Sequence, residues 1–412
     1  MAPNDIPGSV GSSTSFAGDY LCIERDAEWV KREPYAPLTE NKVTRELWSQ
    51  FHVKEYKFQS EIEIPVLFLW PKRPTDEEVK EDKEGRPIHV RFFGGGFCTG
   101  SADNVDWYPP WKLRMMKDTN SITIAPNHRL LPEANGQQIL ADIDAFWANY
   151  DGLLNEFLKD HDKIRANKNK LLITGTSSGG FAAMHSWLGS APQTLKAVFL
   201  AYPMLASYAK EPGDYRGVQM SSDVARKSWK RSIERIQELR ERGELQYRVG
   251  SIPPEGMDMS CLLPMVREDN GITAWQNCFG EDDILQRVQA MSLRDMPEHH
   301  APIFIAHGRR DNPVPAAHST NLKKWLQEAC SPGSLLIDIW FKDTEPNDHG
   351  FDTLENELGE QPLEDRPNNT GLQTMIKNCK MWWLTEEWNQ KRNRDPVPPP
   401  KKSTQQTVQP PS

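Results

Sequence analysis

LLITGTSSGGFAAMHSW, residues 171–187, is the stretch from which the fold can be predicted. It begins with a continuous apolar run, which is typical of a strand buried on both faces, and it ends with small and apolar residues at helical spacing. Between the two lie Gly175 and Gly179, with Ser177 midway. Glycines permit a tight turn, so the stretch predicts a strand, a sharp corner and a helix, with a serine at the corner.

The corner matches the pattern G-x-S-x-G, which in this strand–turn–helix context presents a nucleophilic serine. The turn lifts the Ser177 hydroxyl clear of the backbone, and the amino end of the helix favours negative charge that develops beside it. The alternative is that Ser177 only caps the helix. The predicted strand before it and the helix after it favour the nucleophile.

A serine hydroxyl needs a base to take its proton, and the base needs an acid to orient it. Asp311 follows the predicted strand APIFIAHG, and His349 follows the predicted strand SLLIDIWF. Both therefore lie at carboxyl ends of strands, the edge of the sheet where Ser177 also lies. We predict Ser177 as nucleophile, His349 as base and Asp311 as acid.

Other residues of the same types are less well placed for these roles. His307 is interpreted as a core residue at the end of a strand. Three histidines have no loop at a strand end to present them: His299, His300 and His318. Two rival acids do not follow the strand that precedes Asp311: Asp343 and Asp348.

Short apolar runs alternate with helical patterns along most of the chain, which predicts a mainly parallel sheet covered by helices on both faces. The predicted strands are residues 61–70, 86–93, 120–126, 170–177, 195–203, 301–308 and 334–341. The stretch 205–300 is far longer than an ordinary connection between a strand and a helix, and we expect it to form a helical cap over one end of the sheet. The core is then expected to comprise 51–204 and 301–390, followed by a disordered Pro/Gln-rich tail, 391–412.

The composition limits the class of protein. Of the 412 residues, 37% are hydrophobic and 26% charged, as in an ordinary globular protein, and the net charge of −9 disfavours nucleic acid as a partner. No apolar run approaches the roughly 18 residues of a membrane span, and no secretory signal is visible, so a cytoplasmic location is expected. The six cysteines form no CxxC pair, and no zinc-ligand spacing is present. We expect neither a metal nor a cofactor.

Three further motifs complete a pattern. FGGGF (residues 93–97) follows a predicted strand, NHRLLPE (127–133) follows the next one, and GTSSGG (175–180) forms the corner. Together with the order of Asp311 and His349, they resemble the hormone-sensitive-lipase-like branch of the α/β-hydrolases over roughly residues 50–390. That branch has H-G-G-G-F, D-Y-R-L-A-P-E and G-D-S-A-G-G at these places. The main departure is Phe93, where the family has a histidine that supports the glycine loop.

The resemblance implies an α/β-hydrolase fold with a mostly parallel central sheet, helices on both faces and a helical cap. It implies an oxyanion hole formed by the backbone amides of Gly95, Gly96 and Ser178, because backbone without side chains can approach a ligand closely. It also implies that an N-terminal segment, residues 1–50, contributes to the cap.

These features predict a serine hydrolase that cleaves a small-molecule ester, lactone or related acyl substrate through an acyl-enzyme on Ser177. A mainly apolar substrate is suggested by aromatic residues that could equally be core residues: Phe92, Phe97, Trp107 and Trp111. Two alternatives stay open. One is a transacylase or cyclising hydrolase of a biosynthetic pathway, and the other is a non-catalytic protein that binds a small molecule on the same fold.

Overall fold

The computed structural model describes residues 41–72, 84–206, 214–215, 218–219, 222–250, 274–279, 283–292, 295–297, 301–311, 313–330, 334–344, 349–353, 361–362 and 365–385. All structural statements below refer to these residues. Three expectations therefore fall wholly or partly outside them: the N-terminal segment up to residue 40, much of the 205–300 cap, and the 391–412 tail.

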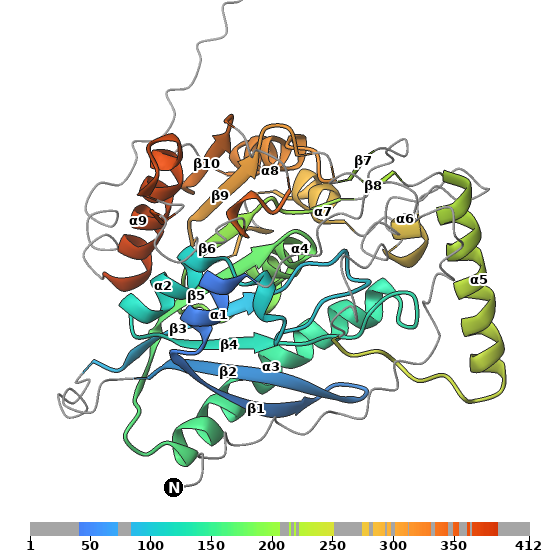
Figure 1. The fold of residues 1–412 in the computed structure, drawn as a ribbon, viewed down its shortest axis with the longest axis horizontal. Coiled ribbons are helices and arrows are strands. Elements are labelled where there is room, and N and C mark those ends of the chain that lie inside the picture. The colour runs from blue at the N-terminus through green and yellow to red at the C-terminus, as the bar shows by residue number, and fades with distance from the viewer. Residues whose placement is uncertain are drawn as a thin grey trace, which may run out of the picture.

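An eight-stranded sheet runs through the molecule in the order β1-β2-β4-β3-β5-β6-β9-β10 (Figure 1). Only the pairs β1-β2 and β2-β4 are antiparallel, and all other neighbours are parallel. The mainly parallel sheet predicted from the sequence is thus confirmed. The strands are β1 (Phe51–Gln59), β2 (Glu63–Pro71), β3 (Arg86–Phe92), β4 (Ile122–Pro126), β5 (Ala166–Thr176), β6 (Leu195–Ala201), β9 (Ile303–Gly308) and β10 (Ile337–Lys342).

Helices cover both faces of this sheet. One face is covered by α3 (Gly136–Asp160), α4 (Ser178–His185), α7 (Ile284–Ala290) and α8 (Ala317–Ala329). The other face is covered by α1 (Lys42–Trp48), α2 (Pro110–Asp118) and α9 (Thr370–Leu384). Every residue of β3, β4 and β9 is buried, as expected for strands with helices on both sides.

The 205–300 stretch contributes several separate elements. They are the short strands β7 (Asp214–Tyr215) and β8 (Val218–Gln219), and the helices α5 (Ser222–Glu241), α6 (Ala274–Phe279) and α7. The long helix α5 lies to one side of the sheet (Figure 1). In contrast, α7 packs against α4 and α8, so it belongs to the helix layer that covers the sheet.

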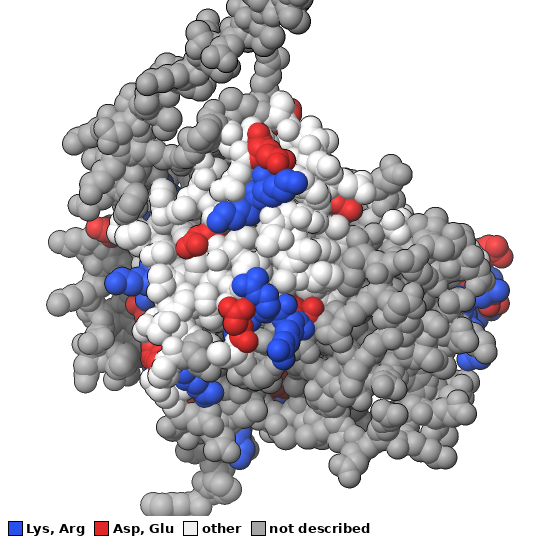
Figure 2. Space-filling model, turned by 90° about the horizontal axis from the view of Figure 1, so that it is seen from above, with Lys and Arg blue, Asp and Glu red and all other residues white. Residues whose placement is uncertain are grey.

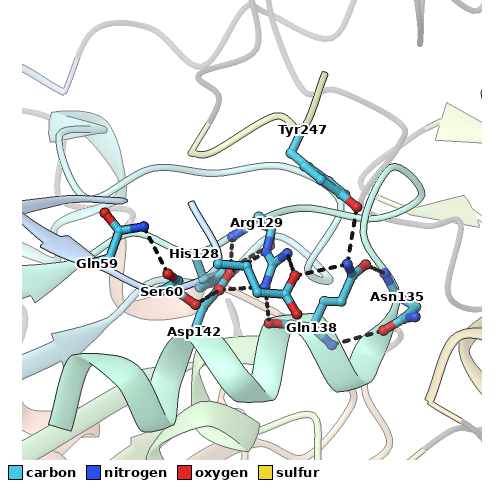
Figure 3. Close-up of polar contacts among 9 residues, drawn as sticks. Gln59, Ser60, His128, Arg129, Asn135, Gln138, Asp142 and Tyr247 are labelled. Carbon is cyan, nitrogen blue, oxygen red and sulfur yellow. Dashed lines mark hydrogen bonds and ion pairs between the residues drawn. The ribbon is translucent and has the colours of Figure 1, made fainter. Parts of the chain in front are cut away.

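A buried ion pair fixes the segment that follows β4 onto α3. Arg129 donates to both carboxylate oxygens of Asp142, through Nε to Oδ2 at 2.9 Å and through Nη2 to Oδ1 at 2.8 Å. Figure 3 shows this pair beside the start of α3, where Asn135 and Gln138 cap the helix reciprocally. Residues 127–133 are therefore held against α3, next to the loop that follows β3.

Lys112 of α2 is a second buried cation, on the opposite face of the sheet. Its Nζ has no hydrogen-bond partner among the described residues. Burial, together with the charge of the neighbouring Arg91, lowers the pKa of Lys112 to about 7. Burial without a hydrogen-bond partner disfavours the charged amine more than the nearby Asp352 favours it, so protonation of this side chain opposes folding.

We expect Lys112→Met to stabilise the protein below pH 7, on the order of 3 kcal/mol in the free energy of unfolding. In the wild type the unfolded chain binds a proton at Lys112 that the folded chain has lost between about pH 7 and 10. Wild-type stability should therefore rise over this range, and the gain from methionine should shrink. Urea unfolding at pH 6 and pH 9 measures it, with the exposed Lys117→Met of the same helix as control. An equal effect at both pH values would contradict this account.

Candidate active site

The corner predicted from the sequence lies between β5, which ends at Thr176, and α4, which begins at Ser178. Ser177 has φ 52° and ψ −125°, a backbone conformation that residues other than glycine rarely adopt. The flanking glycines are required by close backbone contacts. A Cβ at Gly175 would lie 2.1 Å from the carbonyl oxygen of Gly179, and one at Gly179 would lie 2.4 Å from that of Phe92. Glycine at both positions thus lets the end of β5, the start of α4 and the end of β3 pack closely around Ser177.

Ser177, His349 and Asp311 form a chain of hydrogen bonds. The Nε2 atom of His349 lies 3.0 Å from the Ser177 hydroxyl, and its Nδ1 atom lies 2.8 Å from Oδ2 of Asp311. The three residues follow β5, β10 and β9, so they meet at the carboxyl edge of the sheet. An ionised carboxylate only accepts, so Nδ1 carries the proton and Nε2 is left to accept from the serine hydroxyl.

Asp311 is held in its ionised form. Burial raises its pKa, but the partners His349 and His307 outweigh this effect and lower the pKa of Asp311 to about 2. The backbone N–H of Val314 also donates to Oδ1 at 2.8 Å. The site therefore places a buried negative charge behind the imidazole of His349, which stabilises that ring when it takes up a proton.

The loop after β3 lies directly beside Ser177, because a Cβ at Gly94 would be 3.0 Å from the Cβ of the serine. Gly95, Gly96 and Phe97 all have positive φ, at 109°, 63° and 60°. The Phe97 amide donates to Oγ of Ser178 at 3.2 Å. Ser178 thus ties the glycine loop to the amino end of α4, so the three predicted oxyanion residues lie in two segments that contact each other.

A model of the α/β hydrolase fold matches residues 89–243, which include the end of β3, the glycine loop and the corner at Ser177. The chain has the α/β-hydrolase fold.

Proteins similar to this chain include esterases. The chain is 25% identical to a probable carboxylesterase of Phoma sp. over 305 residues, which cover 73% of this chain and 88% of the relative. A probable carboxylesterase of Cochliobolus lunatus is 31% identical over 88 residues, 21% of this chain and 40% of the relative. Among solved structures, an esterase of Pyrobaculum calidifontis aligns at 15% identity and a TM-score of 0.48, covering 88% of this chain and 94% of the esterase.

The departure at Phe93 has a structural counterpart. The buried Phe93 ring stacks on the ring of His128, with centroids 4.6 Å apart and an interplanar angle of 13°. His128 comes from the 127–133 segment, and its Nδ1 lies 2.7 Å from the Arg129 carbonyl oxygen. At the start of the glycine loop, a stacked pair of rings therefore takes the place of the polar histidine side chain of the hormone-sensitive-lipase-like pattern.

Several residues at the site were missed by the sequence analysis or given another role. His307 is buried, as expected of a core residue, but its Nε2 also lies 3.3 Å from Oδ2 of Asp311. Tyr202, with φ 39°, packs its ring 4.5 Å from the His349 ring and donates its hydroxyl to Asp352 at 2.7 Å. In the sequence, only the position of these residues at the ends of predicted strands could have indicated such contacts.

The rival residues lie elsewhere where the structure describes them. His318 is buried, accepts from the Leu205 amide, and has its pKa lowered to about 3 by burial, so its ring is neutral. Asp343 is exposed and pairs with Arg309 at 2.9 Å. The remaining three, His299, His300 and Asp348, are outside the described residues.

Three of the four aromatic residues, Phe92, Phe97 and Trp111, are fully buried in the hydrophobic core. Phe92 and Trp111 are buried on opposite faces of the sheet, and Trp111 donates to Asp352 at 3.1 Å. Trp107 is partly buried. Among the described residues, Phe97 is the one of the four that contacts aromatic rings of the 205–300 stretch, those of Trp275 and Phe279 in α6.

The described residues include no helix that is both long and apolar enough to span a bilayer. Within the same residues, no group of three or more His, Cys, Asp or Glu side chains is placed to hold a metal ion. Figure 2 shows Lys and Arg beside Asp and Glu over the described part of one face, rather than a continuous patch of one sign.

Proposed function

We propose that this protein is a serine hydrolase that cleaves a carboxylic ester or lactone of a mainly apolar small molecule through an acyl-enzyme on Ser177. The observation that carries the proposal is the hydrogen-bonded chain from Ser177 through His349 to the ionised Asp311. The carboxylesterase relatives support an ester as substrate. A protein that only binds a ligand would have no need of this proton-transfer geometry.

In this mechanism, Nε2 of His349 accepts the proton of Ser177 as the hydroxyl oxygen attacks the carbonyl carbon. Negative charge then develops on the carbonyl oxygen, where the amides of Gly95, Gly96 and Ser178 would donate hydrogen bonds. The imidazolium gives its proton to the leaving alcohol, and the acyl group stays on the serine. Water, deprotonated by the same imidazole, releases the acid. An alcohol in place of water would make the same site a transacylase.

A fluorophosphonate probe tests the nucleophile. We expect stoichiometric labelling of the intact protein, a mapped adduct on Ser177, and a parallel loss of p-nitrophenyl butyrate hydrolysis. The Ser177→Ala variant should take up no label. Labelling confined to Ser178, or full hydrolytic activity in labelled protein, would contradict the proposal.

The 205–300 stretch is proposed as a cap that selects the substrate. Its helix α6 brings Trp275 and Phe279 against Phe97, the residue that follows the glycine loop. The N-terminal segment is proposed to join it, because the described chain begins at Asn41, whose side chain donates to the Thr353 carbonyl, four residues after His349. Both segments thus contact loops that hold the site.

Phe279→Leu tests the cap while largely conserving volume. We expect the substitution to change kcat/KM by unequal factors for short and long p-nitrophenyl esters. Each methylene group of the acyl chain that gains or loses burial should change kcat/KM by about fourfold. The exposed Arg240→Ala of α5 is the control. Equal changes for all esters would indicate that Phe279 serves packing alone.

A further inference from the structure

Residues 247–250, which follow α5, lie along the 127–133 segment. A β-bridge joins Val249 to Arg129, the Leu130 amide donates to the Arg248 carbonyl at 3.0 Å, and the Gly250 amide donates to the His128 carbonyl at 3.3 Å. Figure 3 shows the neighbouring Tyr247 side chain pointing to α3, where its hydroxyl accepts from Gln138 at 3.1 Å. This part of the 205–300 stretch is therefore docked by backbone bonds beside the glycine loop.

The side chain of Arg248 extends these contacts to the glycine loop itself. Its guanidinium group makes a bidentate pair with Glu133, through Nε to Oε1 at 2.7 Å and through Nη2 to Oε2 at 2.9 Å. Nη1 donates to the Cys98 carbonyl at 3.1 Å, and Nη2 donates to the Leu131 carbonyl at 2.6 Å. The Glu133 side chain is only 2% exposed and that of Arg248 19%, so solvent screens the pair little.

The carbonyls of Cys98 and Leu131 lie next to the hydrogen bond that joins the glycine loop to the 127–133 segment. The Phe97 carbonyl accepts from the Leu131 amide at 2.8 Å. Arg248 thus binds the carbonyl of Leu131, the residue that donates this bond, and the carbonyl of Cys98, the residue that follows the acceptor. The Phe97 amide is the group that Ser178 holds. One guanidinium group thus clamps the loop just beyond the segment expected to bind the oxyanion. Lysine, a single point of charge without a planar fork, cannot make all four bonds.

We propose that Arg248 is a positioning residue that couples docking of the inserted stretch to the shape of the glycine loop beside Ser177. This inference rests on the proposed function for its effect on catalysis. Its effect on the loop does not depend on activity. When residues 247–250 are docked, Arg248 holds the Cys98 and Leu131 carbonyls together. When they are not, the loop loses this support and keeps the bonds of Phe97 to Ser178 and to Leu131.

The test compares Arg248→Ala and Arg248→Lys with Arg242→Ala, whose partner Glu244 is 58% exposed and which lies on the same stretch. Loss of an oxyanion donor itself would lower kcat roughly 10²–10³-fold. For the indirect effect of Arg248 we expect a smaller loss: kcat for p-nitrophenyl acetate should fall about 10- to 100-fold in both Arg248 variants, with KM within about threefold of the wild type. Guanidinium ion at millimolar concentration should restore much of the kcat of Arg248→Ala, and urea at the same concentration should not. Arg242→Ala should match the wild type.

Hydrogen–deuterium exchange gives a second measurement that needs no substrate. We expect faster exchange in the peptide that spans residues 94–99 of Arg248→Ala, reversed by guanidinium, with unchanged exchange in β10. Unchanged exchange of residues 94–99, or a fall in kcat that tracks thermal unfolding and resists guanidinium, would overturn the proposal. If exchange changes in Arg248→Ala as expected but the wild type hydrolyses no ester, the coupling is upheld and the proposed function is refuted.

Discussion

Replacement of Ser177 by alanine is expected to lower kcat for a p-nitrophenyl ester by about 10⁶-fold, to the residual rate that binding and the oxyanion hole provide. The hydroxyl is the atom that His349 faces at 3.0 Å, and alanine offers no nucleophile in its place. The fold should persist, because the side chain is small and the corner is set by the two glycines around it. Steady-state kinetics on highly purified protein measure the effect.

The control for this variant is thermal unfolding, which should be close to that of the wild type. A rate within tenfold of the wild type in a well-folded Ser177→Ala protein would show that another residue attacks the substrate. The proposed acyl-enzyme would then be wrong, whatever the geometry around Ser177.

Asp311→Asn is expected to lower kcat by about 10⁴-fold while leaving KM nearly unchanged. An amide group can donate to Nδ1 of His349, which favours the tautomer with a proton on Nε2, and that tautomer cannot accept the serine proton. The matched control is Asp343→Asn on the surface, which should have wild-type kinetics. A loss of less than tenfold in Asp311→Asn would mean that a different group orients the imidazole.

The same variant should change the response to acid. The pKa of Asp311 is about 2 in the folded chain, below its ordinary value of about 3.9 in an unfolded chain. Its ionised form therefore stabilises the wild type above about pH 4, and this contribution, on the order of 2 kcal/mol, is lost as the pH falls toward 2. Asp311→Asn should lack that component of acid unfolding, which urea titrations at pH 5 and pH 3 would show.

The parallel part of the sheet could be predicted because strands buried on both faces are continuous apolar runs. The strand β1, residues Phe51–Gln59, was not among the strands predicted. It lies at the edge of the sheet, and most of its side chains are exposed, so its sequence HVKEYK lacks both an apolar run and a clean alternation. Edge strands are identified by their pairing partner, which the sequence alone does not reveal.

The same distinction applies to the site. Ser177, Asp311 and His349 could be predicted together because the carboxyl ends of parallel strands meet at one edge. Arg248 could not, because it follows the charged run ELRERGELQY and has the appearance of a solvated surface residue. Its contacts with Glu133 and the Cys98 carbonyl join residues more than a hundred positions apart, and only the fold brings them together.

Phe97, Ser177 and Tyr202 all have positive φ angles, which sets a limit on how this protein can be made more robust. Each such conformation at a residue with a side chain costs on the order of 1–3 kcal/mol, and all three residues lie at or beside the hydrogen-bonded chain. Substitutions that relieve these conformations would raise the stability of the fold. Under the proposed function they would also lower the turnover rate. With that function, thermal stability and catalytic rate therefore place opposite demands on the same three residues.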